Sequence, residues 1–115
     1  MTSASKRKGS QAERDVVTYL QSVGWPYAER RLAGSTTDRG DIAGVGAGAV
    51  CIEVKNHSRL ALGDWIDQVE VETVHARANV GVCIHKRRGK TSVGDWYATL
   101  PVHMLVTLLK EAGYQ

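Results

Sequence analysis

A short apolar run that ends in two charged residues constrains the fold of this chain more than any other feature. Residues 49–52 are apolar and are followed by Glu53-Val54-Lys55. Side chains alternate between the two faces of a strand, so Glu53 and Lys55 would share one face and the apolar side chains the other. A carboxylate and an ammonium at the end of a buried strand are costly to remove from water. The run therefore predicts a buried strand whose charged face has a function.

A second acid, Asp41, lies twelve residues before Glu53. A strand over residues 41–45, with a turn at 44–48, would form a hairpin with the run and bring Asp41 near Glu53. Taken separately, Gly-Asp is a common turn and the charged pair could face water. Taken together, two adjacent carboxylates repel each other without a cation, so they favour a site for a hard divalent cation. Lys55 could then hold an attacking water or stabilise an anionic transition state.

The length of 115 residues predicts a single domain. We expect residues 1–8 to be a disordered basic tail and residues 9–115 to be the folded domain. The chain has no apolar stretch long enough for a bilayer and no apolar signal-peptide core, which favours the cytoplasm, or the host cytoplasm for a phage protein. Cys51 and Cys83 lie in apolar runs without zinc-ligand spacing, so we expect them to be buried free thiols.

The hydrophobic pattern predicts the order α-β-β-β-α-β-β-α, which is an α/β sandwich with a mixed five-stranded sheet. The expected helices cover residues 10–23, 62–78 and 101–111, and the expected strands cover residues 27–32, 41–45, 49–55, 80–85 and 93–100. Ser10 would cap the first helix, with Glu13 at the capping-box position.

Two further polar residues could join the acids. Glu13 borders the core-facing side of the first helix, but one rotamer cannot serve both the site and the capping box. Gln68 lies in the middle of the second helix beside Val69, where a long amide reaches the site or, more commonly, faces water.

Basic residues gather in three places in a chain whose net charge is +3. They are Lys6-Arg7-Lys8, then Arg30-Arg31 with Arg39, and then Lys86-Arg87-Arg88 with Lys90. Basic segments around a focused acidic pocket suit an enzyme that cuts a polyanion. Each segment alone could instead be a solvated loop or tail, and for Lys6-Arg7-Lys8 the two interpretations have equal weight.

Asp41, eleven intervening residues and Glu53-Val54-Lys55, preceded by a helix that carries Glu13, resemble the PD-(D/E)XK nuclease superfamily. Within it the chain is similar to the archaeal-type Holliday-junction resolvases and to small phage and restriction-type endonucleases. The similarity covers about residues 8–90. The proline of the superfamily name is absent, because Arg39-Gly40 precedes Asp41. The resemblance implies a restriction-endonuclease-like fold and a metal-dependent hydrolase that acts in DNA recombination and repair.

The resemblance also implies roles for single residues. The catalytic set would be Glu13, Asp41, Glu53, Lys55 and Gln68. Asp41, Glu53 and the Val54 carbonyl would hold Mg²⁺, for which Mn²⁺ can substitute, and Glu13 would bind it directly or through water. Lys55 would position the nucleophilic water and offset charge on the phosphate. The loop from Arg30-Arg31 to Arg39, with Ser35, Thr36 and Thr37, resembles the resolvase segment that contacts the DNA backbone. From the distribution of charge we also expect DNA contacts by Lys8, Lys86, Arg87, Arg88 and Lys90.

A four-way DNA junction is nearly two-fold symmetric, so a resolvase should be a homodimer. The last helix offers apolar material for an interface, although the same residues could cover the sheet of a monomer: Val102, Leu105, Val106, Leu108 and Leu109. The alternatives to a resolvase are another nuclease of the same fold (an exonuclease, a nicking enzyme or a restriction-type subunit) and a DNA-binding module that has lost catalysis.

Three aromatic residues, Trp65, Trp96 and Tyr97, could stack on bases or fill the core. Because the chain has no phenylalanine, we expect all three in the core. No helix looks suited to reading base edges, so recognition should depend on DNA shape and backbone.

Overall fold

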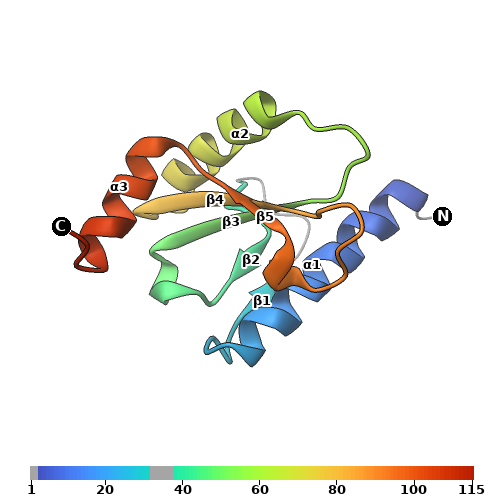
Figure 1. The fold of residues 1–115 in the computed structure, drawn as a ribbon, viewed down its shortest axis with the longest axis horizontal. Helices are drawn as coiled ribbons and strands as arrows, with labels where there is room; N and C mark the ends of the chain where they lie inside the picture. The colour runs from blue at the N-terminus through green and yellow to red at the C-terminus, as the bar shows by residue number, and fades with distance from the viewer. Residues whose placement is uncertain (1–2, 32–37) are drawn as a thin grey trace.

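The computed structural model describes residues 3–31 and 38–115, which form three α-helices around a five-stranded mixed sheet (Figure 1). In chain order the elements are α1 (Ala4–Ser22), β1 (Glu29–Arg30), β2 (Ile42–Ala43), the 3₁₀ turn η1 (Gly46–Gly48), β3 (Val50–Lys55), α2 (Leu62–His75), β4 (Val80–His85), the 3₁₀ turn η2 (Val93–Asp95), β5 (Tyr97–Thr99) and α3 (Val102–Glu111). The predicted α/β class, the mixed sheet and the order of the elements are confirmed.

The five strands lie side by side in the order in which they occur in the chain. The strands of the pair β3–β4 are parallel, with Lys55 opposite His85, and the other neighbours are antiparallel. A parallel pair needs a crossover connection, which α2 supplies here. The carboxyl ends of β3 and β4 therefore lie next to each other, and the chain leaves both strands at the same edge of the sheet.

The two faces of the sheet are covered by different helices. α1 packs Val16 and Leu20 into a core with Ile52, whereas α2 packs Val69 against Cys83. Successive β3 side chains alternate between these two cores, so Glu53 lies on the α2 side of the sheet.

The first helix begins at Ala4, so the prediction that it begins at Ser10 was wrong. The Ser3 side chain caps it by accepting a hydrogen bond from the Lys6 N–H at 3.1 Å. Residues 4–8, which we expected to belong to a disordered tail, are its first turns, because a serine N-cap followed by alanine, lysine and arginine favours a helix. Ser10 is then in mid-helix and cannot form the predicted capping box with Glu13.

Most other predicted boundaries were too wide. The structure has β1 only at Glu29–Arg30 and β2 only at Ile42–Ala43, and residue 32 of the predicted first strand lies outside the described residues. The predicted strand at 93–100 begins instead with η2, because Gly94 and Asp95 favour a turn, and only Tyr97–Thr99 is strand. None of the helices among the described residues is long and apolar enough to cross a membrane.

Two of the three aromatic residues expected in the core are there. Trp65 and Trp96 are buried, whereas Tyr97 is 46% exposed, so the prediction was wrong for Tyr97. Its ring lies beneath the Arg87 guanidinium, 5.4 Å from the ring centre. A tyrosine on an edge strand can expose one ring face while a cation covers the other.

Both cysteines are buried free thiols, as predicted. Burial raises the pKa of the Cys51 thiol to about 11 and that of Cys83 to about 12. Neither is therefore a nucleophile near neutral pH.

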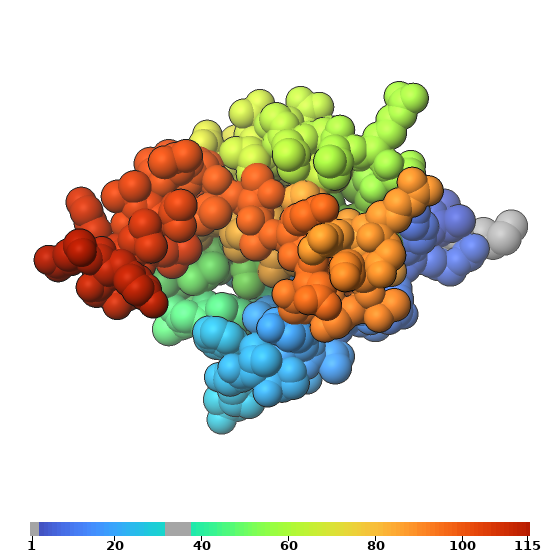
Figure 2. Space-filling view, viewed as in Figure 1, coloured from blue at the N-terminus to red at the C-terminus, as the bar shows by residue number. Residues whose placement is uncertain are grey.

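The last helix, α3, lies beside α2, where His103 Nε2 is 3.7 Å from Glu70 Oε1. Its buried anchor is Met104, whose sulfur accepts a hydrogen bond from the Gly81 N–H at 3.1 Å. The helix projects from one end of the molecule (Figure 2). All five apolar side chains considered for an interface are exposed: Val102, Leu105, Val106, Leu108 and Leu109.

Candidate active site

The backbone around Asp41 is fixed from two sides. Its N–H donates to the Ile52 carbonyl at 2.8 Å, and its carbonyl accepts from the Arg31 N–H at 2.8 Å. The preceding residue, Gly40, has a φ of +93°, and a Cβ there would lie 2.9 Å from the Ile52 carbonyl oxygen and 3.0 Å from the Cys51 sulfur. Glycine at this position therefore allows the close approach that brings Asp41 against β3.

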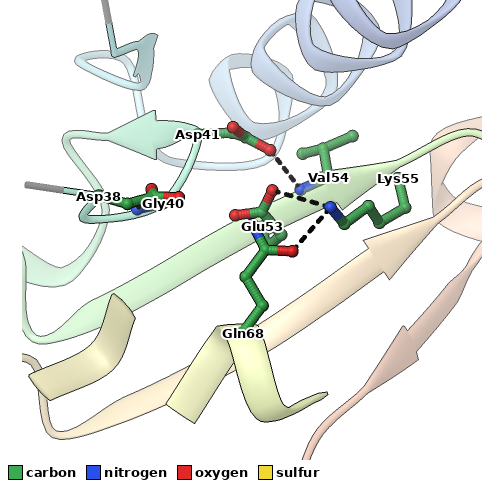
Figure 3. A network of polar contacts seen from close by, with 7 residues as sticks. All are labelled: Asp38, Gly40, Asp41, Glu53, Val54, Lys55 and Gln68. Carbon is green, nitrogen blue, oxygen red and sulfur yellow. Dashed lines mark hydrogen bonds and ion pairs between the residues drawn. The ribbon is translucent and has the colours of Figure 1, made fainter. Parts of the chain in front are cut away.

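The Asp41 side chain is aimed at β3 (Figure 3). Its carboxylate accepts a hydrogen bond from the Val54 N–H at 2.8 Å, which places it between the residues that carry Glu53 and Lys55. Glu53 is only 4% exposed. Burial, the Glu72 carboxyl and the Asp41 carboxyl all raise the pKa of Glu53 far above its ordinary value. The structure therefore brings the two acids together at one edge of the sheet.

Lys55 lies between an acid and an amide. Its Nζ is 3.6 Å from Glu53 Oε1 and donates a hydrogen bond to Gln68 Oε1 at 2.9 Å (Figure 3). Gln68 thus reaches the site from α2, although we expected a mid-helix glutamine to face water more often. The two contacts fix the ammonium beside the carboxylates.

Glu13 approaches the site from α1, on the opposite side of the sheet from Gln68. It is half-buried, and its Oε1 pairs with Arg30 Nε at 3.2 Å. Burial raises the pKa of Glu13, and the nearby Asp41 carboxylate raises it further, while Arg30 opposes this. Glu13 therefore lies near enough to Asp41 for the two carboxylates to interact electrostatically, but its own carboxylate is already paired with Arg30.

Two acids were missing from the sequence-based site. Glu72 is 1% exposed, and the pKa of its carboxyl is raised mainly by burial. Asp38 is exposed, and its Oδ1 accepts from the Gly40 N–H at 3.0 Å. The sequence contained a signal for Glu72, which lies at the i+7 position from Trp65 and the i+3 position from Val69, within the apolar stripe of α2. Glutamate is rarely buried unless its charge is paired, so a glutamate within an apolar stripe indicates a specific role. No comparable pattern marks Asp38.

A basic pocket opens where the chain leaves β3 and β4. It has a volume of about 420 Å³ and is lined by Lys8, Asn56, His57, Ser58, Lys86, Arg87, Arg88 and Gly89. These described residues include four cations and no acid. The pocket begins one residue beyond Lys55, and the Lys86 N–H donates to the Lys55 carbonyl at 3.0 Å. The first turns of α1 lie beside the segment after β4 (Figure 2).

The other residues considered for DNA contacts are scattered. Arg30 is paired with Glu13, Arg31 is half-buried, and Arg39 and Lys90 are exposed but do not line the pocket. Ser35, Thr36 and Thr37 lie outside the described residues.

Comparison with protein-family models, curated proteins and solved structures finds no match to this chain.

Proposed function

We propose that this protein is a metal-dependent nuclease that hydrolyses phosphodiester bonds in DNA. One observation carries the proposal: Asp41, Glu53 and Lys55 meet at adjoining strands, with Gln68 holding the lysine amine. The helix–sheet–helix arrangement is compatible with the restriction-endonuclease-like fold of the superfamily that the motif resembles. Carboxylates that bind a cation and an amine that faces the phosphate are the groups such a reaction requires.

The acids suit a hard divalent cation. Glu53 is buried, and its Oε2 has no hydrogen-bond partner among the described residues. A buried carboxylate oxygen without a donor needs a proton or a cation to be stable. Asp41 and Glu53 would hold Mg²⁺ or Mn²⁺, with the Val54 carbonyl as a further oxygen ligand and Glu13, already paired with Arg30, acting through water. The bound cation would supply Lewis-acid stabilisation of the phosphate charge.

Lys55 has the position required to act on the nucleophile. Gln68 and Glu53 hold its ammonium within the site, so it needs no rearrangement to face an incoming phosphate. It would orient the attacking water and offset the negative charge that builds up on the phosphate oxygens. Gln68 would act through Lys55 and is a positioning residue.

The basic pocket supports a polynucleotide as the substrate. A DNA strand whose reacting phosphate lay at Lys55 would find Lys86, Arg87 and Arg88 within the adjoining pocket. Such contacts neutralise backbone phosphates and position the strand without reading its sequence. A branched substrate such as a four-way junction, cut by a homodimer, is the specific form of this proposal, and the exposed apolar residues of α3 offer a surface for the partner subunit.

The test is cleavage of a panel of labelled junction, flap, nicked and linear DNA with Mg²⁺, together with the protein's mass in solution. We expect cutting that EDTA abolishes, a preference for the junction and the mass of a dimer. Glu53→Gln should lose cleavage but keep junction binding, while Glu70→Gln, an exposed glutamate of α2, should behave as wild type.

Each alternative gives a different result. Equal cutting of linear duplex would contradict junction selectivity but not nuclease activity. Unchanged cleavage by Glu53→Gln would show that the site is wrong. Tight DNA binding without cleavage by any metal-loaded sample would identify a binding module instead.

A further inference from the structure

Glu72 is the most deeply buried acid among the described residues and the least well satisfied. It lies on α2, one turn beyond Gln68, and is 1% exposed. Neither of its carboxylate oxygens has a hydrogen-bond partner among the described residues. The nearby Glu53 Oε2 also lacks one. Three buried carboxylate oxygens are therefore left without a hydrogen bond from the described residues, although buried polar atoms are nearly always paired.

A third carboxylate completes this cluster. One oxygen from each of Asp38, Glu53 and Glu72 lies within 4.8 Å of the others. Two oxygens bound to opposite sides of one cation are about 4 to 5 Å apart, because each metal–oxygen bond is about 2.0 to 2.6 Å long. The cluster therefore has the size of a single coordination sphere. Asp38 is oriented for this by the Gly40 N–H, which occupies its Oδ1.

Within the described part of the chain, Glu72 and Asp38 form no ion pair with a lysine, arginine or histidine. The Lys55 ammonium lies 3.6 Å from Glu53 Oε1 and donates to Gln68, whereas the unpaired oxygen of Glu53 is Oε2. An external cation or a bound proton must balance the charge.

We propose that Glu72, Glu53 and Asp38 form a divalent-cation site on the α2 side of the sheet, in which Glu72 is a metal ligand outside the motif Asp41…Glu53-Val54-Lys55. The inference extends the proposed nuclease site, since Glu53 belongs to both, but cation binding here does not require cleavage. All three ligands are carboxylates, so the site would take a hard cation such as Mg²⁺, Mn²⁺ or Ca²⁺ rather than a metal that prefers nitrogen or sulfur. Glu72 would bring α2, and with it Gln68, into the metal centre.

The competing state is a proton shared between Glu53 and Glu72 with no cation. The substitution Glu72→Gln separates the two, because a glutamine amide can donate to Glu53 but, being neutral, binds a hard cation more weakly than a carboxylate does. If the cluster binds a cation, the variant without metal should be more stable than wild type without metal. Adding metal should then no longer stabilise the variant. If the pair only shares a proton, the variant should respond to metal as wild type does.

The experiment is a titration of the full-length protein with Mn²⁺, followed by calorimetry and by the thermal unfolding midpoint, for wild type, Glu72→Gln and the exposed control Glu70→Gln. We expect Glu72→Gln to weaken Mn²⁺ binding by at least about tenfold, since even residues that only support a ligand have effects of that size. Its midpoint in EDTA should rise and its gain on adding Mn²⁺ should shrink. Glu70→Gln should match wild type in all three measurements.

Wild-type Mn²⁺ affinity in folded Glu72→Gln would overturn the proposal. Should that variant fail to fold, Asp38→Asn tests the same site from an exposed position and must itself weaken Mn²⁺ binding, with the exposed Asp67→Asn as its control. Mn²⁺ binding that needs Glu72 in a protein that cleaves no DNA would support this inference and contradict the proposed nuclease function, so the two can fail separately.

Discussion

The carboxylate of Asp41 accepts a hydrogen bond from the Val54 N–H at 2.8 Å, across a separation of thirteen residues. The bond joins the segment that enters β2 to the carboxyl end of β3 (Figure 3). It satisfies a strand N–H that would otherwise need another acceptor. Asp41 therefore stabilises the fold as well as contributing a carboxylate to the candidate site. Substitutions can separate these two roles.

Asp41→Asn should retain the fold and lose the chemistry. The asparagine carbonyl can still accept from the Val54 N–H, but the residue no longer carries the charge that a cation requires. Asp41→Ala loses both, and we expect it to lower the free energy of unfolding by about 1 to 3 kcal/mol, the range for a hydrogen bond to a charged group. Urea unfolding measures the stability and Mg²⁺-dependent cleavage measures the activity. Equal destabilisation by the two variants would show that the Val54 bond contributes nothing.

Gly40→Ala should destabilise the protein more than Gly48→Ala. Both glycines have positive φ, +93° and +88°, so both substitutions carry the backbone penalty of about 1 kcal/mol. Only at Gly40 would the added Cβ meet other atoms, whereas nothing lies within 4 Å at Gly48. We therefore expect an additional loss of about 1 to 3 kcal/mol at Gly40, typical of overpacking. Urea unfolding of both variants gives the difference, and equal losses would show that β3 moves aside without penalty.

The order of the elements could be predicted because hydrophobic period and turn residues are local signals. The alternation of residue types correctly predicted that Glu53 and Ile52 lie on opposite faces of β3, and the structure has Glu53 on the α2 side. The start of α1 could not be predicted in the same way. Its first turns are solvent-exposed and have no apolar stripe, so the only signals were helix-favouring residues and a possible cap at Ser3, and Ser10 offered a second possible cap.

The candidate site was only partly accessible from the sequence. Asp41, Glu53 and Lys55 form a spaced motif, but the contacts that complete the site join residues from different elements. Gln68 meets Lys55 because α2 packs against both β3 and β4, and the path of a crossover helix is a tertiary property. Asp38 lies in a loop whose course depends on the packing of Gly40 against Ile52. The positions of Gln68 and Asp38 depend on how closely separate backbone segments pack together, which residue types alone do not specify.

Gln68→Leu should slow cleavage without weakening DNA binding. Leucine cannot accept from the Lys55 ammonium, so the amine loses one of the two contacts that fix it. We expect kcat to fall about tenfold or more, as for a misplaced catalytic group, while Kd for DNA measured in Ca²⁺ stays unchanged. Asp67→Asn, an exposed neighbour on α2, is the control.

A double substitution tests whether Gln68 acts through Lys55. In the Lys55→Met background, the additional change Gln68→Leu should have little further effect on kcat, because the group that it positions is already gone. Independent, additive losses would show that Gln68 contributes in some other way, and a parallel fall in DNA affinity would point to general loosening of α2.

Stability of the metal-free protein should fall as the pH rises through the neutral range. Burial and neighbouring carboxyls raise the pKa of both Glu53 and Glu72 above the ordinary value of 4.5. For Glu72, the Asp38 and Asp41 carboxylates add to the rise in pKa, while the neighbouring Glu53 and Gln68 side chains oppose it. Between that ordinary value and the raised pKa the native state holds protons that the unfolded chain has released, so each further rise in pH favours unfolding.

The measurement is the thermal unfolding midpoint in EDTA from about pH 6.5 to about pH 8. Below this range His85 acts in the opposite direction, since burial lowers its pKa and the unfolded chain takes up the additional proton. Above it the buried cysteines begin to contribute, because the pKa of each thiol is raised in the native state.

We expect the midpoint to fall across the range in wild type and Glu70→Gln and to fall less in Glu72→Gln. Added Mn²⁺ should raise the wild-type midpoint most at the upper end, where the carboxyls have lost their protons. A midpoint that rises with pH in EDTA, or equal slopes in wild type and Glu72→Gln, would show that the Glu53–Glu72 pair binds no additional proton in the native state across this range.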